Sequence, residues 1–166
     1  MSNVLPLKKK EFAFEKQISD LTNLCKEDLV SVNTIIVDKL DSNVPLVKEV
    51  AKYLILSGGK RLRPLLTVSS YHMINNEKNT SENKINHIGL SAAVEFIHTA
   101  TLLHDDVIDE SKQRRGNPTA NEKWRNKTSV LVGDFLFSRA FQLMTKYGNQ
   151  DTLRILADTS VTISEG

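Results

Sequence analysis

The stretch HDDVIDESKQRRG, residues 104–116, combines residue types that bind metal ions with residue types that bind phosphate groups. If its acidic part is helical, Asp105 and Asp109 lie one turn apart on the same face. Two carboxylates held that close repel each other unless a cation lies between them. Because the candidate ligands are all oxygen atoms, with no His/Cys spacing nearby, they favour Mg²⁺ over zinc. The adjacent arginines Arg114 and Arg115 are suited to phosphate oxygens that complete the coordination of Mg²⁺.

For a lone DDxxD pattern, a solvated acidic turn beside a basic loop is the simpler interpretation. The preceding run VEFIHTATLL, residues 94–103, argues against it, because this run predicts a buried helix that carries the acids to a pocket. His98 comes seven residues before Asp105 and eleven before Asp109, so the three lie near one line of that helix. A lone histidine in an apolar helix is more commonly a hydrogen-bonded core residue, but this alignment favours the pocket. His104 is angled away from the line and is expected to be structural.

A second motif, GGKRLRP at residues 58–64, places Lys60, Arg61 and Arg63 at a glycine turn that leads into a helix. Free backbone N–H groups, the positive end of the helix dipole and flexible cations together form an anion site. The alternative is ordinary helix punctuation with surface cations. A nucleic-acid patch is disfavoured, because no aromatic or further basic residues surround the motif. Together with the first motif, it predicts cations and metal ligands that converge on phosphate.

The composition is that of a soluble globular protein with one domain, residues 1–166. Hydrophobic residues make up 40%, charged residues 25%, and the net charge of +2 does not by itself imply nucleic-acid binding. Cys25 is the single cysteine, which rules out an internal disulfide, and we expect it to pack as a small hydrophobic residue. There is no apolar run of about 18 residues, and the first residues do not resemble a signal or transit peptide. We therefore expect a cytoplasmic protein.

The periodicity of apolar residues predicts an all-α fold. One amphipathic helix is expected from Phe14 to Ile36, and a second is expected to begin at Pro45 with Asn43 as its cap and to end at Ser57-Gly58-Gly59. A helix from Pro64 to about Ile74 and a surface loop over residues 75–83 come next. The further helices are a long one that reaches the aspartates, a short one over residues 119–127, an apolar one over residues 130–147, and one from about Asp151.

These motifs also identify a family. GGKRLRP, HxxxLLHDDVID, the RRG at residues 114–116 and GDFLFSRA at residues 133–140 resemble the trans-type polyprenyl diphosphate synthases, octaprenyl- or solanesyl-like long-chain synthases among them. The resemblance spans roughly residues 54–166, in order and with the expected spacing. It implies the isoprenoid synthase fold and a prenyltransferase that condenses isopentenyl diphosphate with an allylic diphosphate, with Mg²⁺ as cofactor. It also implies a homodimer in the complete protein, with no nucleic acid and no membrane span.

The resemblance assigns roles residue by residue. Asp105 and Asp109 would be the principal metal ligands, with Asp106 supporting them, and Arg114 would hold the allylic diphosphate. The diphosphate of isopentenyl diphosphate would be held by Lys60, Arg63, His98 and Arg115.

One departure concerns length. Family members are about twice as long and carry a second aspartate-rich motif and a lysine-threonine pair, whereas this sequence stops at TISEG. The resemblance therefore implies the N-terminal half of a synthase, and we expect little or no synthase activity from these 166 residues alone. Two alternatives remain open. One is a catalytically inactive fragment or regulatory subunit of a prenyl synthase, and the other is a non-enzymatic helical module that binds phosphate.

Ala100 and Thr101 bear on product length. In short-chain relatives, bulky aromatic residues just before the first aspartate close the pocket that receives the growing chain. The two small residues here predict an open pocket and a long product, of the kind used for quinone side chains. The alternative is that small residues at these positions serve close packing between helices.

Overall fold

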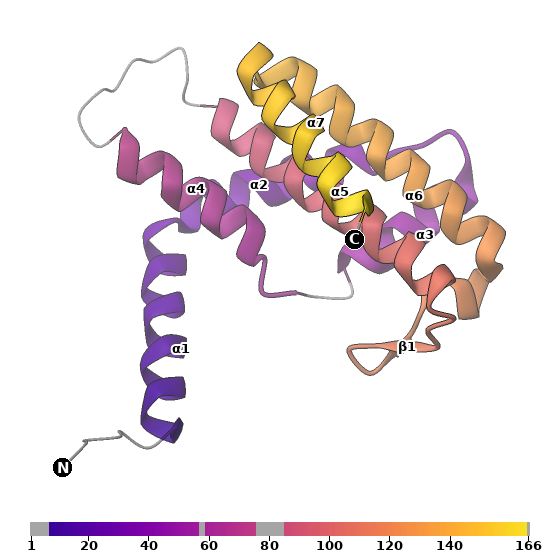
Figure 1. Ribbon diagram of the computed structural model, residues 1–166, viewed down its shortest axis with the longest axis horizontal. Helices are drawn as coiled ribbons and strands as arrows, with labels where there is room; N and C mark the ends of the chain where they lie inside the picture. Colours follow the sequence, from indigo (N-terminus) through magenta and orange to yellow (C-terminus); the bar gives the residue numbers. More distant parts are fainter. Residues whose placement is uncertain (1–6, 57–58, 76–84, 166) are drawn as a thin grey trace.

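Two long helices, α5 (Asn86–Ile108) and α6 (Ala120–Tyr147), pack against each other at the centre of the molecule (Figure 1). The computed structural model describes residues 7–56, 59–75 and 85–165, with the backbone alone described for residues 7–13 and 56. Within these ranges the regular secondary structure is helical apart from one short hairpin, so the all-α prediction is confirmed. The apolar run predicted to be buried supplies the centre of the core, where Phe96, Ala100 and Leu103 are almost inaccessible to solvent.

The other helices surround this pair. α2 (Lys26–Lys39) and α4 (Leu62–Ile74) pack against α5, and α3 (Pro45–Leu56) packs against α6. α7 (Gln150–Glu165) follows α6, and α1 (Leu7–Leu24) projects away from the bundle (Figure 1). Along the described residues, no helix is long and apolar enough to cross a membrane.

The first predicted helix is two helices in the structure. α1 and α2 meet at Cys25, whose backbone has φ −95° and ψ 11°. Hydrogen bonds from the Cys25 N–H to the Leu21 carbonyl (3.1 Å) and from the Leu29 N–H to the Cys25 carbonyl (2.9 Å) continue across the break. The apolar periodicity therefore runs through the junction without interruption. Cys25 is buried and free, as expected.

Proline marks two helix starts as predicted. Pro45 begins α3, and Pro64 lies in the first turn of α4. Before α3, the Ser42 hydroxyl accepts a hydrogen bond from the Val44 N–H (3.1 Å), so the described contact comes from Ser42 and not from Asn43. The predicted helix end at residues 57–58 and the predicted loop at residues 76–83 lie outside the described residues.

Two predicted helices, over residues 119–127 and 130–147, join into α6. The junction is a kink at Arg125, whose φ of 71° and ψ of 159° are not helical. A two-stranded antiparallel hairpin, β1 (Gln113–Arg114) and β2 (Asn117–Pro118), was not expected from the sequence. Strands of two residues are too short to show the alternation by which strands are recognised.

The contact between α5 and α6 depends on glycine at position 133. A Cβ atom built on Gly133 would lie 2.2 Å from Nε2 of His104, so the imidazole of α5 occupies the space that a side chain on α6 would need. His104 thus points towards α6, where its Nε2 lies 3.3 Å from the Val130 carbonyl oxygen and 3.6 Å from Oδ1 of Asp134. This confirms the structural placement predicted for His104.

We predict that Gly133→Ala lowers the free energy of unfolding by about 1–3 kcal/mol, the usual effect of overpacking. The effect should appear although alanine favours a helix by about 1 kcal/mol over glycine. Urea unfolding of the single variants and of the Gly133→Ala/His104→Ala double variant measures the coupling between the two positions. A Gly133→Ala protein as stable as the parent would contradict the close contact.

Candidate active site

The aspartate-rich motif forms the C-terminal end of α5. Asp105 and Asp109 are exposed, and the Asp109 N–H donates to the Asp105 carbonyl oxygen at 2.8 Å, so the two residues stand one helical turn apart as predicted. Asp109 ends the helix as its C-cap. Two exposed carboxylates on one face match the donor set of Mg²⁺, which takes one or two carboxylates and fills its other positions with water and phosphate oxygens.

Asp106 lies on a different face of α5 and is buried, with 2% of its surface exposed. Its carboxylate accepts hydrogen bonds from Nε and Nη2 of Arg114, the shortest at 2.7 Å. This paired geometry is the strong form of an arginine–carboxylate contact. The hydrogen bond to Asp106 raises the pKa of Arg114, and the charges of the three aspartates add to the effect. Asp106 thus anchors the hairpin to α5.

The hairpin turns at Arg115 and Gly116, which both have positive φ (52° and 78°). Positive φ at both central residues is typical of the type I′ turn that joins two-residue hairpins. The base of the hairpin is held by the Thr119 hydroxyl, which donates to the Ser111 carbonyl at 2.6 Å. The Tyr53 hydroxyl donates to the Pro118 carbonyl at 2.9 Å and ties the hairpin to α3. These two hydrogen bonds therefore hold the hairpin at its base and at β2.

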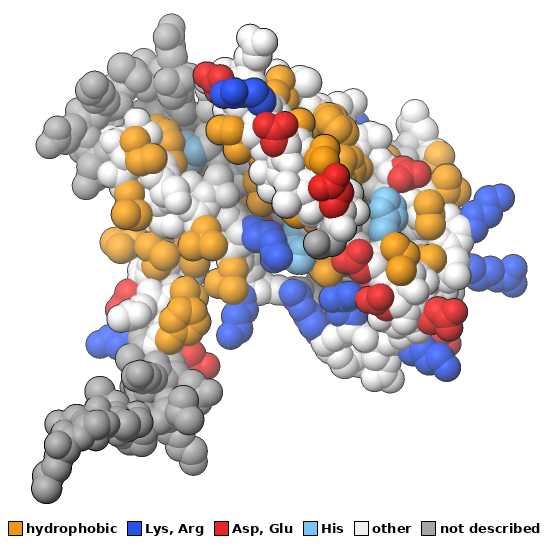
Figure 2. Space-filling view, viewed as in Figure 1, with side chains coloured by type: hydrophobic (Ala, Val, Ile, Leu, Met, Phe, Trp, Pro, Cys, Tyr) orange, Lys and Arg blue, Asp and Glu red, His pale blue; other side chains and the backbone are white. Residues whose placement is uncertain are grey.

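The cations predicted to bind isopentenyl diphosphate meet at one cavity. A cavity of about 450 Å³ lies between the start of α4, the middle of α5 and the hairpin turn. Figure 2 shows Lys and Arg side chains gathered around a hollow in this part of the surface. Its lining includes all four predicted residues, Lys60, Arg63, His98 and Arg115.

Gly59 lies directly against the Arg115 side chain. A Cβ atom built there would lie 2.6 Å from Nη1 of Arg115, so the guanidinium packs directly on the Gly59 backbone. The two motifs, far apart in the sequence, therefore touch at this point. Arg115 and Arg114 also line a second, smaller cavity of about 70 Å³, together with Asp106 and His98.

Arg61 was predicted among the cations of the anion site, and its pairing with Glu95 was missed by the sequence analysis. Arg61 is paired with Glu95 of α5, at 2.6 Å between Nη1 and Oε1, and its Nη2 donates to the Ile55 carbonyl at 3.0 Å. The Arg61 and Glu95 side chains are 22% and 11% exposed. A signal was present in the sequence, because a glutamate within an apolar run needs a partner when it is buried. The pair fixes the segment with Lys60 and Arg63 against α5.

His98 faces the cations, as its alignment with the acids predicts. Burial lowers its pKa below the ordinary 6.5, and the charge of Arg63 and then that of Arg115 lower it further, against an opposing effect of Glu95. His98 is therefore a neutral hydrogen-bonding group near pH 7 in the unliganded protein.

The two residues predicted to govern product length differ in their surroundings. Ala100 is buried in the core, and Thr101 is half-buried with its hydroxyl donating to the His98 carbonyl at 2.9 Å. Neither lines the two cavities described above. The structure describes close helix packing around Ala100, which is the alternative raised for these small residues.

The all-α fold thus carries exposed carboxylates at the end of α5 and a cavity lined by cations. Residues 44–166 match the polyprenyl synthetase family, and the chain belongs to this family. Over 149 residues it is 42% identical to octaprenyl diphosphate synthase of Escherichia coli (strain K12), an alignment that covers 90% of this chain and 44% of that protein. The family prediction is thus confirmed.

Solved structures agree with this result. A decaprenyl diphosphate synthase from Rhodobacter capsulatus superposes with a TM-score of 0.81 and 50% identity, covering 89% of this chain and 44% of that one. A polyprenyl synthase from Caulobacter crescentus CB15, complexed with calcium and isoprenyl diphosphate, superposes with a TM-score of 0.82 and 45% identity, covering 89% and 43%. The isoprenoid synthase fold is confirmed, and the chain spans less than half the length of these relatives.

The pKa of His98 gives a test of this geometry. We predict that the imidazole titrates below 6.5 in the unliganded protein and that Arg63→Gln raises its pKa, whereas Lys60→Gln changes it less. NMR titration of the imidazole ring measures both. Because folded His98 resists the proton that the unfolded chain accepts, the free energy of unfolding should fall as the pH drops through 6.5. His98→Gln should weaken that fall, and a pKa at or above 6.5 in the parent would contradict the placement of His98 among cations.

Proposed function

We propose that this chain is part of a prenyltransferase that adds isopentenyl units to an allylic diphosphate and makes a long-chain polyprenyl diphosphate for quinone or other isoprenoid biosynthesis. The observation that carries the proposal is that α5 bears two exposed carboxylates, Asp105 and Asp109, about two and three turns beyond His98, which lines the cation cavity. The carboxylates suit a diphosphate bound through a metal ion, and the cations suit a diphosphate bound directly. Support also comes from relatives that are named octaprenyl and decaprenyl diphosphate synthases.

In this proposal Asp105 and Asp109 hold Mg²⁺ through their carboxylate oxygens. Bound there, Mg²⁺ would supply positive charge to the oxygens of the allylic diphosphate. Arg114 would contact the same diphosphate from the hairpin while its Nε and Nη2 remain on Asp106. Asp106 would therefore act by holding Arg114 in place.

The cation cavity would hold the second substrate. Lys60, Arg63 and Arg115 carry positive charge for the diphosphate of isopentenyl diphosphate, and the imidazole of His98 offers a hydrogen bond. In the reaction, the carbon–oxygen bond of the allylic diphosphate breaks, the double bond of isopentenyl diphosphate attacks the allylic carbon, and a proton is lost. The diphosphate leaves with the bonding electrons, and the cations would stabilise the negative charge that develops on it.

The complete enzyme is proposed to act as a homodimer in the cytoplasm. Several helices expose large apolar side chains, which supports a contact that buries them in the complete protein. Figure 2 shows such side chains on the visible face. Examples on α4 and α6 are Leu66, Met73, Leu131 and Phe141.

We predict that Asp105→Asn or Asp109→Asn in the full-length protein lowers turnover by about 100-fold or more, because loss of one preorganised electrostatic group has effects of this size. Stability should change by less than about 0.5 kcal/mol, since both side chains are exposed. Asp134→Asn is the matched control, because Asp134 is an exposed aspartate of α6 that lines neither cavity.

The same assay separates the alternatives. An inactive relative or regulatory subunit would give no turnover in the parent. A phosphate-binding module without enzyme activity would bind an allylic diphosphate with no requirement for Mg²⁺. Rates for the Asp105→Asn and Asp109→Asn variants within a few-fold of the parent would contradict the metal assignment.

Product length is the finer part of the proposal. We propose that the growing chain passes Thr101 and Ala100, which lie about one turn before Asp105 on α5. The half-buried position of Thr101 supports this, whereas the full burial of Ala100 in the core favours the packing alternative for that residue.

We predict that Thr101→Phe shortens the products of the complete enzyme, because an aromatic ring closes the space that small residues leave. Thr101→Val is the control, since it adds no bulk, and its products should keep the parent length. Ala100→Phe should also shorten products, with a loss of about 1–3 kcal/mol in stability from overpacking. Chromatography of the prenyl products measures all three. Farnesyl diphosphate as the parent's main product would refute the open pocket.

A further inference from the structure

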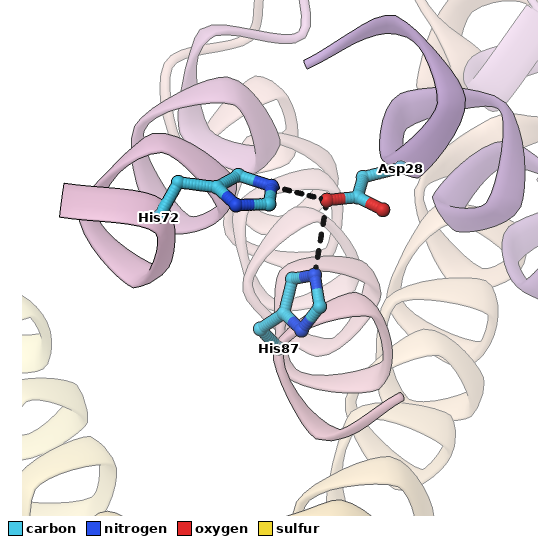
Figure 3. Close-up of side chains that lie close together, drawn as sticks. All are labelled: Asp28, His72 and His87. Carbon is cyan, nitrogen blue, oxygen red and sulfur yellow. Dashed lines mark hydrogen bonds and ion pairs between the residues drawn. The ribbon is translucent and has the colours of Figure 1, made fainter. Parts of the chain in front are cut away.

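Three ligand-type side chains converge at the end of the bundle opposite the aspartates. Asp28 lies in the first turn of α2, His72 in the last turn of α4, and His87 at the start of α5. Oδ2 of Asp28 lies 2.6 Å from Nε2 of His72 and 3.1 Å from Nε2 of His87, with the two imidazoles directed at the same oxygen (Figure 3). The three ligand atoms all lie within 4.8 Å of one another. Two of the four histidines of the chain are thus in one cluster.

The cluster is separate from the diphosphate site. His87 and Asp105 are 18 residues apart on α5, which at 1.5 Å per residue places their backbones roughly 27 Å apart. Neither of the cavities at the candidate active site is lined by a residue of the cluster.

The imidazole of His87 is held in a fixed orientation. It is 7% exposed and stacks on the ring of Tyr71, with 3.7 Å between ring centroids and 2° between ring planes. Asp28 is 25% exposed and His72 is 52% exposed, so the cluster is closed on the side of α5 and open towards solvent on the side of His72.

Two imidazole nitrogens and one carboxylate oxygen suit a divalent transition metal. Zn²⁺ binds histidine nitrogen at about 2.0–2.1 Å and carboxylate oxygen at about 2.0–2.2 Å, which in a tetrahedral site puts neighbouring ligand atoms about 3.3 Å apart. The observed separations of 2.6 and 3.1 Å need only small side-chain movements to reach that geometry. Burial raises the pKa of Asp28, but hydrogen bonds from His72 and His87 outweigh it and leave the net pKa below 3.8. The carboxylate is therefore charged near pH 7.

We propose that Asp28, His72 and His87 form a binding site for a divalent transition-metal ion of the Zn²⁺ class, which joins the ends of α2, α4 and α5. The ion would be bound through Nε2 of both imidazoles and one Oδ of Asp28, and any proton held on an Nε2 atom would be released to solvent. The competing interpretation is a clamp of two hydrogen bonds without a metal. The metal site and the hydrogen-bonded clamp place the three side chains alike, so a measurement of metal affinity separates the two interpretations.

Titration of the full-length protein with Co²⁺ and with Zn²⁺, in the absence of Mg²⁺, tests the site. We expect one ion per chain, with the visible absorption of Co²⁺ bound to nitrogen ligands. Asp28→Asn and His72→Gln should each weaken binding by about 100-fold or more, because loss of a residue that only supports a ligand already weakens binding by 10–100-fold. His72 is half-exposed, so its replacement leaves the core intact, and circular dichroism verifies the fold.

Two controls locate the ion. His104→Gln removes a histidine that lies 3.6 Å from a different aspartate, Asp134, and should leave affinity unchanged. The Asp105→Asn/Asp109→Asn double variant should also keep the Co²⁺ signal, because it retains Asp28, His72 and His87. If the double variant loses the signal, the ion is bound at the aspartate motif and the proposal is overturned.

Thermal unfolding provides a second measurement. An ion at 100 times its dissociation constant should raise the Tm of the parent by on the order of 5 °C, and should not do so for His72→Gln. A parent that binds neither ion, or variants Asp28→Asn and His72→Gln that bind as tightly as the parent, would leave the hydrogen-bonded clamp as the correct interpretation.

Discussion

The candidate active site depends on two buried carboxylates of α5, each of which needs a positively charged partner. Glu95 and Asp106 are eleven residues apart, close to three helical turns, so they lie on one face of the helix. A buried carboxylate without a partner is costly, and each of these two is paired with an arginine from a different loop. Arg61 brings the segment before α4 to α5, and Arg114 brings the hairpin. The two loops reach the same helix because of these pairs.

The pairs also divide neighbouring cations between two tasks. In each motif one arginine is held by α5, while its neighbours line the cation cavity: Arg61 is held beside Lys60 and Arg63, and Arg114 beside Arg115. Adjacent residues in extended or turning backbone point in different directions, so neighbouring cations can serve different partners. The ion pairs with α5 thus fix the two segments from which the neighbouring cations reach the cavity. Asp105 and Asp109 show the same division, since they are exposed beside buried Asp106.

Sequence reasoning predicted the features that rest on local chemistry. Pro45 and Pro64 mark helix starts, the apolar run before the aspartates is buried, and His98 lies with the cations because the helical repeat aligns it with the acids. Sequence reasoning did not predict the features that depend on contacts between residues distant in the sequence. The break at Cys25 has no local signal, because the apolar repeat continues through it. Glu95 within an apolar run signals the need for a partner, but the sequence does not show which cation supplies it. Nothing local distinguishes Arg61 and Arg114 from the cations beside them.

Backbone conformation at Arg61 and Arg115 indicates what the cavity requires. Both have positive φ, 46° and 52°, which for a residue with a Cβ costs roughly 1–2 kcal/mol. Glycine or asparagine would relieve this strain at Arg115, the first central position of a type I′ turn. Neither would put a guanidinium on the Gly59 backbone. At Arg61 the ion pair with Glu95 offsets the strain, whereas at Arg115 the hairpin, held by Asp106, Ser111 and Tyr53, keeps the strained turn in place. The backbone is thus held in an unfavourable conformation where a cation must face the cavity.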